Sequence, residues 1–150
     1  MNHNPSMHSS SHVETVQSMY AAFGRGDVAS ILARLHPEVD WRINVDPAAP
    51  GVAHVAPMRP CRGNRSVPDF FAALARDLDF HVFEPRLFLT AGHSVASRVR
   101  IEWTHRGTKK RFAADSLHLF TFDAAGKLTE FREFTDTLGV AASYDAVRST

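Results

Sequence analysis

Two side chains that can move a proton stand in apolar surroundings in the last third of the sequence. His118 lies between two leucines, and Glu133 is flanked by Phe131 and Phe134. A neutral imidazole in an apolar pocket can donate a hydrogen bond or accept a proton near pH 7, and a carboxylate can share such acid–base work. Two other interpretations stay open: a core histidine with one structural hydrogen bond, and a salt bridge from Glu133 to Arg98 or Arg100.

Several other kinds of chemistry are excluded by residue type and spacing. The single cysteine, Cys61, can form neither a disulfide within the chain nor a cysteine-rich zinc site. Gly24-Arg25-Gly26 is too short for a glycine-rich phosphate loop, and no other candidate for one is present. No two histidines in the segment expected to be ordered have the i, i+4 spacing of helical metal ligands. We therefore expect neither a metal nor another cofactor.

The composition is that of an ordinary globular domain. The chain has 150 residues, of which 44% are hydrophobic and 22% charged, and this suits one domain. The formal net charge of +1 disfavours nucleic acid as a partner, because a phosphate backbone needs a marked basic excess. No apolar run approaches the ~20 residues of a membrane-spanning helix. We expect a cytoplasmic protein that binds neither nucleic acid nor membrane.

The first twelve residues differ from the rest of the chain. They contain no Lys, Arg, Asp or Glu and almost nothing apolar, so they lack the basic start and apolar stretch of a secretory signal. We expect a disordered tail over residues 1–12, followed by a single domain over residues 13–150. His3, His8 and His12 are interpreted as part of this frayed terminus rather than as metal ligands.

Apolar periodicity predicts helices in the first half and strands in the second. The i, i+3, i+4, i+7 spacing of Val13, Val16 and Tyr20 is typical of an amphipathic helix, and Asp27 is a candidate N-cap for the next one. The predicted helices cover residues 13–24, 28–35 and 66–78, and the predicted strands cover residues 39–43, 81–90, 94–105, 110–122 and 127–135. This order indicates an α+β fold.

The segment from Asp46 to Gly63 is expected to be a long loop. Its four prolines exclude any long regular element and should prevent it from joining the sheet. Long loops in compact domains are often lids or binding loops. We expect this one to lie over the end of the sheet, with Met58 in the wall of a pocket, although a passive surface insertion would have the same sequence.

Two stretches of the sequence resemble a known superfamily. These are MYAAFGRGDVASILARLHPEVDWRI and LHLFTFDAAGKLTEFREFTD, and together with the helix predicted between them they are similar to the NTF2-like superfamily. It includes ketosteroid isomerases, limonene epoxide hydrolases and SnoaL-like polyketide cyclases. The resemblance covers about Val13 to Gly139. It implies three N-terminal helices packed on a strongly curved antiparallel sheet, which together form a cone with a mostly apolar interior pocket.

The resemblance to ketosteroid isomerases does not carry their catalytic residues over. Their aspartate base falls on Ile43, which cannot move a proton, and the tyrosine of their oxyanion hole falls on Met19. Tyr20 is one position off and is expected to point elsewhere, since one residue turns a helical side chain by about 100°. Their second oxyanion donor falls on His118.

The other two groups imply further residues. The Asp-Arg-Asp set of the epoxide hydrolases falls on Arg98, Arg100 and Glu133, so one carboxylate has become a guanidinium suited to an anionic or carbonyl-bearing ligand. The cyclases use an aspartate at the end of the last strand, which resembles Asp136 in Thr135-Asp136-Thr137-Leu138-Gly139. Strand parity lets only one of Glu133 and Asp136 enter the pocket unless a bulge intervenes.

The resemblance thus implies a site inside the cone. The expected catalytic residues are His118, Glu133 and Asp136, and the expected ligand-binding residues are Trp41, Arg98, Arg100, Ser116, Phe120 and Met58. The expected function is binding of a small, largely apolar molecule with a carbonyl or carboxylate group, with acid–base chemistry of the isomerase, cyclase or hydratase type. The alternative is a non-catalytic ligand-binding or dimerisation module of the same fold.

A homodimer is expected from the other face of the sheet. Strand parity puts one set of apolar residues opposite the pocket: Val95, Val99, Ile101, Trp103, Leu117 and Leu119. A monomer rarely leaves contiguous apolar patches of more than a few hundred Å² in water. We therefore expect two copies of the chain to associate through the outer face of the sheet.

Overall fold

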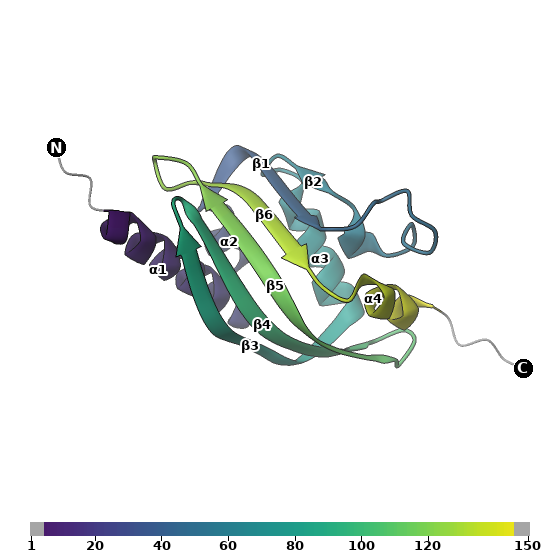
Figure 1. Ribbon diagram of the computed structural model, residues 1–150. Helices are drawn as coiled ribbons and strands as arrows, with labels where there is room; N and C mark the ends of the chain where they lie inside the picture. Colours follow the sequence, from purple (N-terminus) through teal and green to yellow (C-terminus); the bar gives the residue numbers. More distant parts are fainter. Residues whose placement is uncertain (1–4, 146–150) are drawn as a thin grey trace, which may run out of the picture.

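Four long strands in the second half of the chain form an antiparallel meander. They are β3 (Leu78–Ala91), β4 (Ser94–His105), β5 (Arg111–Phe122) and β6 (Leu128–Phe134). Gly92 in the β3–β4 turn has φ 57°, a left-handed conformation that glycine adopts at little cost. The computed structural model describes residues 5–145, and Figure 1 shows this curved meander in front of helices α2 and α3.

Two strands from the first half of the chain complete the sheet. β1 (Leu35–Ile43) pairs with β6 in parallel, and the short β2 (Cys61–Arg62) pairs with β1 antiparallel. The strand order is β2-β1-β6-β5-β4-β3. The predicted α+β fold is confirmed, but the sheet is mixed, because β1 runs parallel to β6, where an antiparallel sheet was expected, and its edges are β2 and β3.

Helices cover one face of this sheet (Figure 1). They are α1 (Pro5–Gly24), α2 (Val28–Leu32) and α3 (Val67–Asp77), while α4 (Thr137–Tyr144) follows the last strand. Asp27 caps α2 as predicted, accepting a hydrogen bond from the Ser30 backbone N–H. The second helix ends at Leu32 rather than Leu35, because β1 already begins there, and α4 was not predicted.

The start of α1 differs from the prediction. The helix begins at Pro5, so residues 5–12 are helical where a disordered tail was expected, and residues 1–4 lie outside the described part. His12 explains the extension, because its ring is buried and stacks on Phe122 at a centroid distance of 4.5 Å. Its Nε2 also lies 3.0 Å from Nδ1 of His93 in the β3–β4 turn. These contacts fix His12 against the sheet, and the local sequence around it gives no sign of them.

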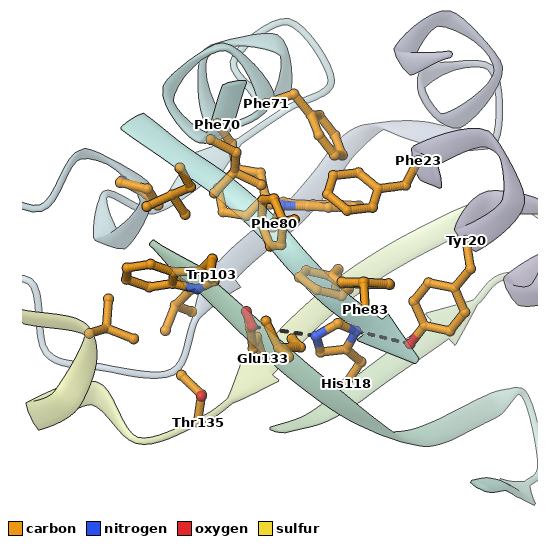
Figure 2. Close-up of a pocket in the computed structure, with 18 of the residues that line it drawn as sticks. Tyr20, Phe23, Phe70, Phe71, Phe80, Phe83, Trp103, His118, Glu133 and Thr135 are labelled. Atoms are coloured by element: carbon orange, nitrogen blue, oxygen red, sulfur yellow. Dashed lines mark hydrogen bonds and ion pairs between the residues drawn. The ribbon is translucent and has the colours of Figure 1, made fainter. Parts of the chain in front are cut away.

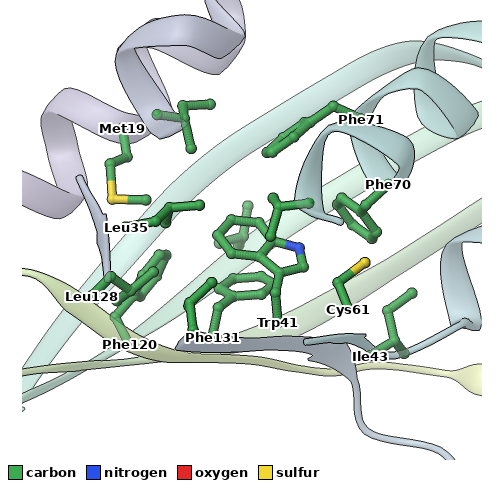
Figure 3. Close-up of a cluster of buried hydrophobic side chains, with 14 of the residues drawn as sticks. Met19, Leu35, Trp41, Ile43, Cys61, Phe70, Phe71, Phe120, Leu128 and Phe131 are labelled. Carbon is green, nitrogen blue, oxygen red and sulfur yellow. The ribbon is translucent and has the colours of Figure 1, made fainter. Parts of the chain in front are cut away.

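The core lies between the sheet and the helices. Trp41 of β1 stacks on its neighbour Phe131 of β6 at 4.1 Å, and Phe70 and Phe71 of α3 cover the indole from the helix side (Figure 3). Such aromatic contacts add to the stabilisation that comes from burial itself. They attach α3 to the strands that lie beneath it.

The assignment of side chains to the two faces of β4 is the reverse of the one predicted. Val95, Val99, Ile101 and Trp103 are buried on the inner face, whereas Arg98 is exposed on the outer face. The register causes this, because Ser97 pairs with His118 and Arg98 with Leu117, and directly opposed residues point to the same side. Parity within each strand was correct, but the phase between the strands was not.

The predicted long loop is confirmed over residues 46–55, which form no helix or strand, whereas the rest of the segment 46–63 differs from the prediction. Cys61 and Arg62 form β2 and join the sheet, so the expectation that the segment could not do so was wrong. A 3-10 turn, η1 (Ala56–Met58), precedes β2, and Val55 and Met58 are fully buried in the core. Only Pro57 of this turn reaches the cavity described below.

Candidate functional site

A cavity of about 90 Å³ lies between the inner face of the sheet and helices α1, α3 and α4 (Figure 2). Most of its wall is aromatic. The aromatic side chains that line it are Tyr20, Phe23, Trp41, Phe70, Phe71, Phe80, Phe83, Trp103, Phe112, Phe120, Phe131 and Tyr144. Ligand sites are commonly of this kind, mostly apolar with few placed polar groups.

The polar groups of the wall gather around His118 of β5, which is only 4% exposed. Its Nδ1 lies 2.9 Å from the Tyr20 hydroxyl, and its Nε2 lies 3.4 Å from a carboxylate oxygen of Glu133 (Figure 2). The strand register produces the second contact, because His118 and Glu133 are directly opposed between β5 and β6. Three groups that can hold protons therefore stand in a row along the cavity wall.

His118 and Glu133 approach each other without forming a hydrogen bond. The 3.4 Å separation is short enough for an ion pair, but Nε2 has no partner with hydrogen-bond geometry among residues 5–145. Buried polar atoms nearly always have such a partner in native proteins. Nε2 of His118 and Nε1 of Trp41, which also lacks a partner among residues 5–145, are therefore the two buried nitrogen atoms of the lining that are left to bond to a ligand after a small side-chain adjustment.

Tyr20 keeps its proton throughout the neutral range. Burial of the phenol raises the pKa of Tyr20 far above its usual value, the nearby Ser97 hydroxyl opposes this effect, and the Glu133 charge adds to it. Tyr20 lies on α1. Its ring packs against Phe83 and Phe88 of β3 and against Phe120 of β5. It reaches His118 as a neutral hydroxyl that can donate a hydrogen bond.

Four of the predicted residues come together in this cavity. His118, Glu133, Trp41 and Phe120 all line it. Ser116 is buried beside it and hydrogen-bonds through its hydroxyl to Thr135, which does line it, at 2.7 Å.

The other four lie elsewhere. Met58 is buried in the core outside the lining, and Arg98 is exposed on the outer face of the sheet. Arg100 lies on that face as well and approaches Glu102 and Asp115 at 3.7 Å. No arginine or lysine lines the cavity within the described ranges, so the expected guanidinium site for an anion is not part of it.

Asp136 has a structural position. Its backbone precedes α4, and its carboxylate accepts a hydrogen bond of 3.0 Å from the Gly139 backbone N–H. This is an N-cap, which satisfies one of the free N–H groups at the start of the helix. Asp136 does not line the cavity, so of the two expected proton carriers only Glu133 faces it.

Asp136→Ala is expected to lower the free energy of unfolding by about 1 kcal/mol, because the cap of α4 is lost. Urea unfolding of both proteins measures the difference, and Asp136→Asn, which keeps a capping oxygen, should recover most of it. Ligand affinity should change little. A loss of more than tenfold in affinity with unchanged stability would show that Asp136 acts on the ligand instead.

Two features of the site were missed. Tyr20 was expected to point elsewhere, although it belongs to the same predicted apolar stripe as Met19 and Phe23, and all three line the cavity. The apolar stripe of this helix was the signal that could have placed Tyr20 at the cavity. Tyr144 was missed because α4 was not predicted, and it closes one end of the cavity while its hydroxyl bonds to Asp77 at 3.2 Å.

Comparisons with known proteins decide the family. Residues 16–131 match the family model of the SnoaL-like domain. The chain belongs to the SnoaL-like family. Comparison with curated proteins finds no match.

Solved structures agree on the SnoaL-like fold. An NTF2-like protein from Burkholderia thailandensis is 29% identical, with a TM-score of 0.75 over 89% of this chain and 97% of that one. TerC, crystallised with polyporic acid, is 23% identical with a TM-score of 0.72, and the match covers 89% of this chain and 97% of TerC. A proposed SnoaL-like polyketide cyclase from Mesorhizobium loti is 18% identical, with a TM-score of 0.63 over 81% and 96% of the two chains. The last two likenesses concern the fold alone.

Two further findings bear on this SnoaL-like chain. No helix in its described part is long and apolar enough to cross a membrane. No group of three or more His, Cys, Asp or Glu side chains between residues 5 and 145 is arranged to hold a metal ion.

Proposed function

We propose that this SnoaL-like protein binds a small, largely apolar carbonyl compound in the cavity and transfers a proton next to the carbonyl group. The observation that carries the proposal is that His118 and Glu133 face one apolar cavity at 3.4 Å from each other. An acid–base pair in an otherwise apolar wall is the arrangement that proton transfer at carbon requires.

In the proposed mechanism His118 is the neutral tautomer with its hydrogen on Nε2. The neutral Tyr20 hydroxyl can donate to Nδ1 when that nitrogen carries no hydrogen, and the Glu133 carboxylate lies on the Nε2 side of the ring. Both contacts are compatible with this tautomer, in which Nε2–H is the donor for the ligand.

The roles in catalysis follow from this tautomer. A carbonyl oxygen of the ligand accepts a hydrogen bond from Nε2–H of His118, and the Glu133 carboxylate removes a proton from the neighbouring carbon. The negative charge that forms on the oxygen is stabilised by Nε2–H, a donor fixed in advance. Glu133 then returns the proton either to the same carbon, which gives hydrogen exchange, or to a conjugated carbon, which gives an isomerisation, and neither outcome changes the number of protons.

Deuterium exchange tests the proposal directly. Proton NMR in D2O would follow loss of the α-hydrogens of cyclohexanone, with and without the protein. We expect the protein to accelerate exchange and the double variant His118→Phe, Glu133→Gln to remove the acceleration. Exchange at the same rate for both proteins would refute proton transfer in this cavity.

The wall also favours a second candidate, a non-catalytic ligand-binding module. Apart from the row around His118, the lining is almost entirely apolar, and such a cavity binds ligands without reacting with them. The same NMR experiment discriminates the two functions. A ligand that shifts the resonances of His118 without losing its α-hydrogens any faster than in buffer would support binding alone.

The outer face of the sheet supports the proposed homodimer, although of the residues expected there the β4 ones face inward and Leu117 remains exposed. Val95, Val99, Ile101 and Trp103 face inward, but the register places two exposed leucines and an exposed phenylalanine in one row with an exposed arginine, one residue from each of four strands. The row is Leu87, Arg98, Leu117 and Phe134. Exposed apolar patches of this kind commonly mark association surfaces.

Light scattering at micromolar concentration is expected to give twice the mass of the chain. Leu117→Glu should shift the mass to that of one chain, because it puts a charge at the centre of the row. Leu138→Glu is the matched control, since Leu138 is 81% exposed on α4 and lies outside the row. A wild-type mass of a single chain would contradict the homodimer.

Tyr20→Phe is expected to alter the pH dependence of stability. Because the folded protein raises the pKa of Tyr20, stability is complete below about pH 10 and decreases as the pH rises further, by up to about 1.4 kcal/mol per pH unit. The variant should lose less stability between about pH 10 and pH 11. Urea unfolding across this range measures it, and equal slopes for both proteins would contradict the burial of a neutral phenol.

A further inference from the structure

The charges around the cavity limit which molecules can enter it. Apart from His118, Glu133 is the only side chain in the lining between residues 5 and 145 that can carry a charge at neutral pH. A buried anion without a cationic partner is strongly disfavoured, and a second carboxylate beside Glu133 would add repulsion. The donor at Nε2 of His118, in contrast, fits an uncharged oxygen.

The free volume limits size in the same way. An engineered cavity of about 150 Å³ in another protein is large enough for benzene. The cavity here holds about 90 Å³. One small ring fits after modest side-chain adjustment, whereas a fused second ring needs the wall to open.

One stretch of wall has a second hollow behind it. Tyr20, Phe23, Phe80 and Phe83 line both the cavity and an outer groove between the end of α1 and the start of β3. Phe23 and Phe83 close this partition with ring centroids 4.9 Å apart, as Figure 2 shows on the side of Tyr20. Phe83 also lies 6.1 Å from the ring of His118, so the partition stands directly beside the reacting group.

Phe83 is the phenylalanine of this partition whose ring lies beside His118. It lies on β3, an edge strand, where it pairs with Ile101 between two shifts of the β3–β4 register. Its side chain is half-buried, like those of the other three members of the partition. Its removal would join the cavity to the groove.

Resting on the proposed function of this cavity, we propose that its ligand is an uncharged carbonyl compound of one ring and that Phe83 determines this size limit. The charge of Glu133 excludes carboxylates. The Phe23–Phe83 partition excludes a second fused ring.

Three probes and two variants test the proposal. NMR titration of the full chain would give the dissociation constants of cyclohexanone, cyclohexanecarboxylate and 2-decalone. We expect cyclohexanone to bind about 100-fold more tightly than the carboxylate, which is a buried-charge effect, and about tenfold more tightly than the two-ring ketone. Phe83→Ala should reverse the preference between the ketones.

Phe88→Ala is the matched control, because Phe88 is a half-buried phenylalanine of the same strand that lines neither hollow. It should keep the wild-type order of affinities. Circular dichroism checks folding, and Phe83→Leu replaces Phe83→Ala if the alanine variant does not fold, with a smaller shift in the same direction.

The outcomes separate this inference from the proposed function. Equal or tighter binding of the carboxylate overturns the charge limit, and equal binding of 2-decalone to the wild type overturns the size limit. An unchanged order in the Phe83 variants overturns the role of Phe83, and absence of cyclohexanone binding overturns the ligand class. Binding in the expected order without faster deuterium exchange would leave this inference standing and refute catalysis.

Discussion

Glu133→Gln is expected to slow the exchange of α-hydrogens about 10²- to 10⁴-fold, because an amide cannot accept the proton that the carboxylate removes. The amide has nearly the same shape, and Nε2 of His118 can still bond to the ligand oxygen. The dissociation constant of cyclohexanone should therefore change little. Exchange rates by proton NMR and affinities by titration measure the two effects separately.

Glu130→Gln is the control for this prediction. Glu130 is on the same strand but faces the other side of the sheet, where it approaches Arg132 at 3.6 Å. Surface pairs of this kind contribute little, so neither exchange nor stability should change appreciably. A Glu133 variant that exchanges α-hydrogens as fast as the Glu130 variant would show that Glu133 is not the base.

Phe120→Ala is expected to have the largest effect on stability, about 3–5 kcal/mol, because it leaves a void in the core. The Phe120 side chain is 2% exposed and packs against the rings of Tyr20, His118 and Phe131. Its loss also removes the support of His118 from one side. Urea unfolding gives the stability, and exchange assays in the absence of urea give the activity.

Phe88→Ala is the reference variant for this measurement of stability as well. The same substitution at a half-buried ring should cost clearly less, because neighbouring chain and water fill the space more easily. Equal losses at the two positions would mean that the cavity wall behaves as a flexible surface and not as core.

Strand parity and the resemblance together predicted that His118 and Glu133 lie on the inner face of the sheet, and the structure places both there. His118 and Glu133 share the inner face because each stands in phase with the apolar residues of its own strand, such as Phe120 and Phe131. Arg98 was predicted on the wrong face of the sheet, because the pattern within one strand does not determine its register with the next strand. The turn between β4 and β5 determines whether Arg98 opposes Leu117 or His118, and a shift of one residue exchanges the two faces.

Long-range contacts account for the other errors. Residues 5–12 have the composition of a tail, but His12 stacks on a phenylalanine that follows it by more than a hundred positions. Cys61 and Arg62 form a strand because β1 offers them an edge, which local periodicity does not report. Tyr20 was misjudged by relying on one alignment position, although its own helix stripe pointed inward.

The parallel pairing of β1 with β6 also determines the order in which the cavity wall can assemble. Trp41 on β1 finds its stacking partner Phe131 only on β6, far along the sequence, and Glu133 lies on the same strand. Contacts between such distant residues form late, because a long stretch of chain must be ordered first. A chain cut before Leu128 would leave β1 without its long neighbour and His118 without the Glu133 carboxylate. The β3–β4–β5 pairs can form without β6, whereas β1 joins the sheet and Glu133 meets His118 only once β6 is in place.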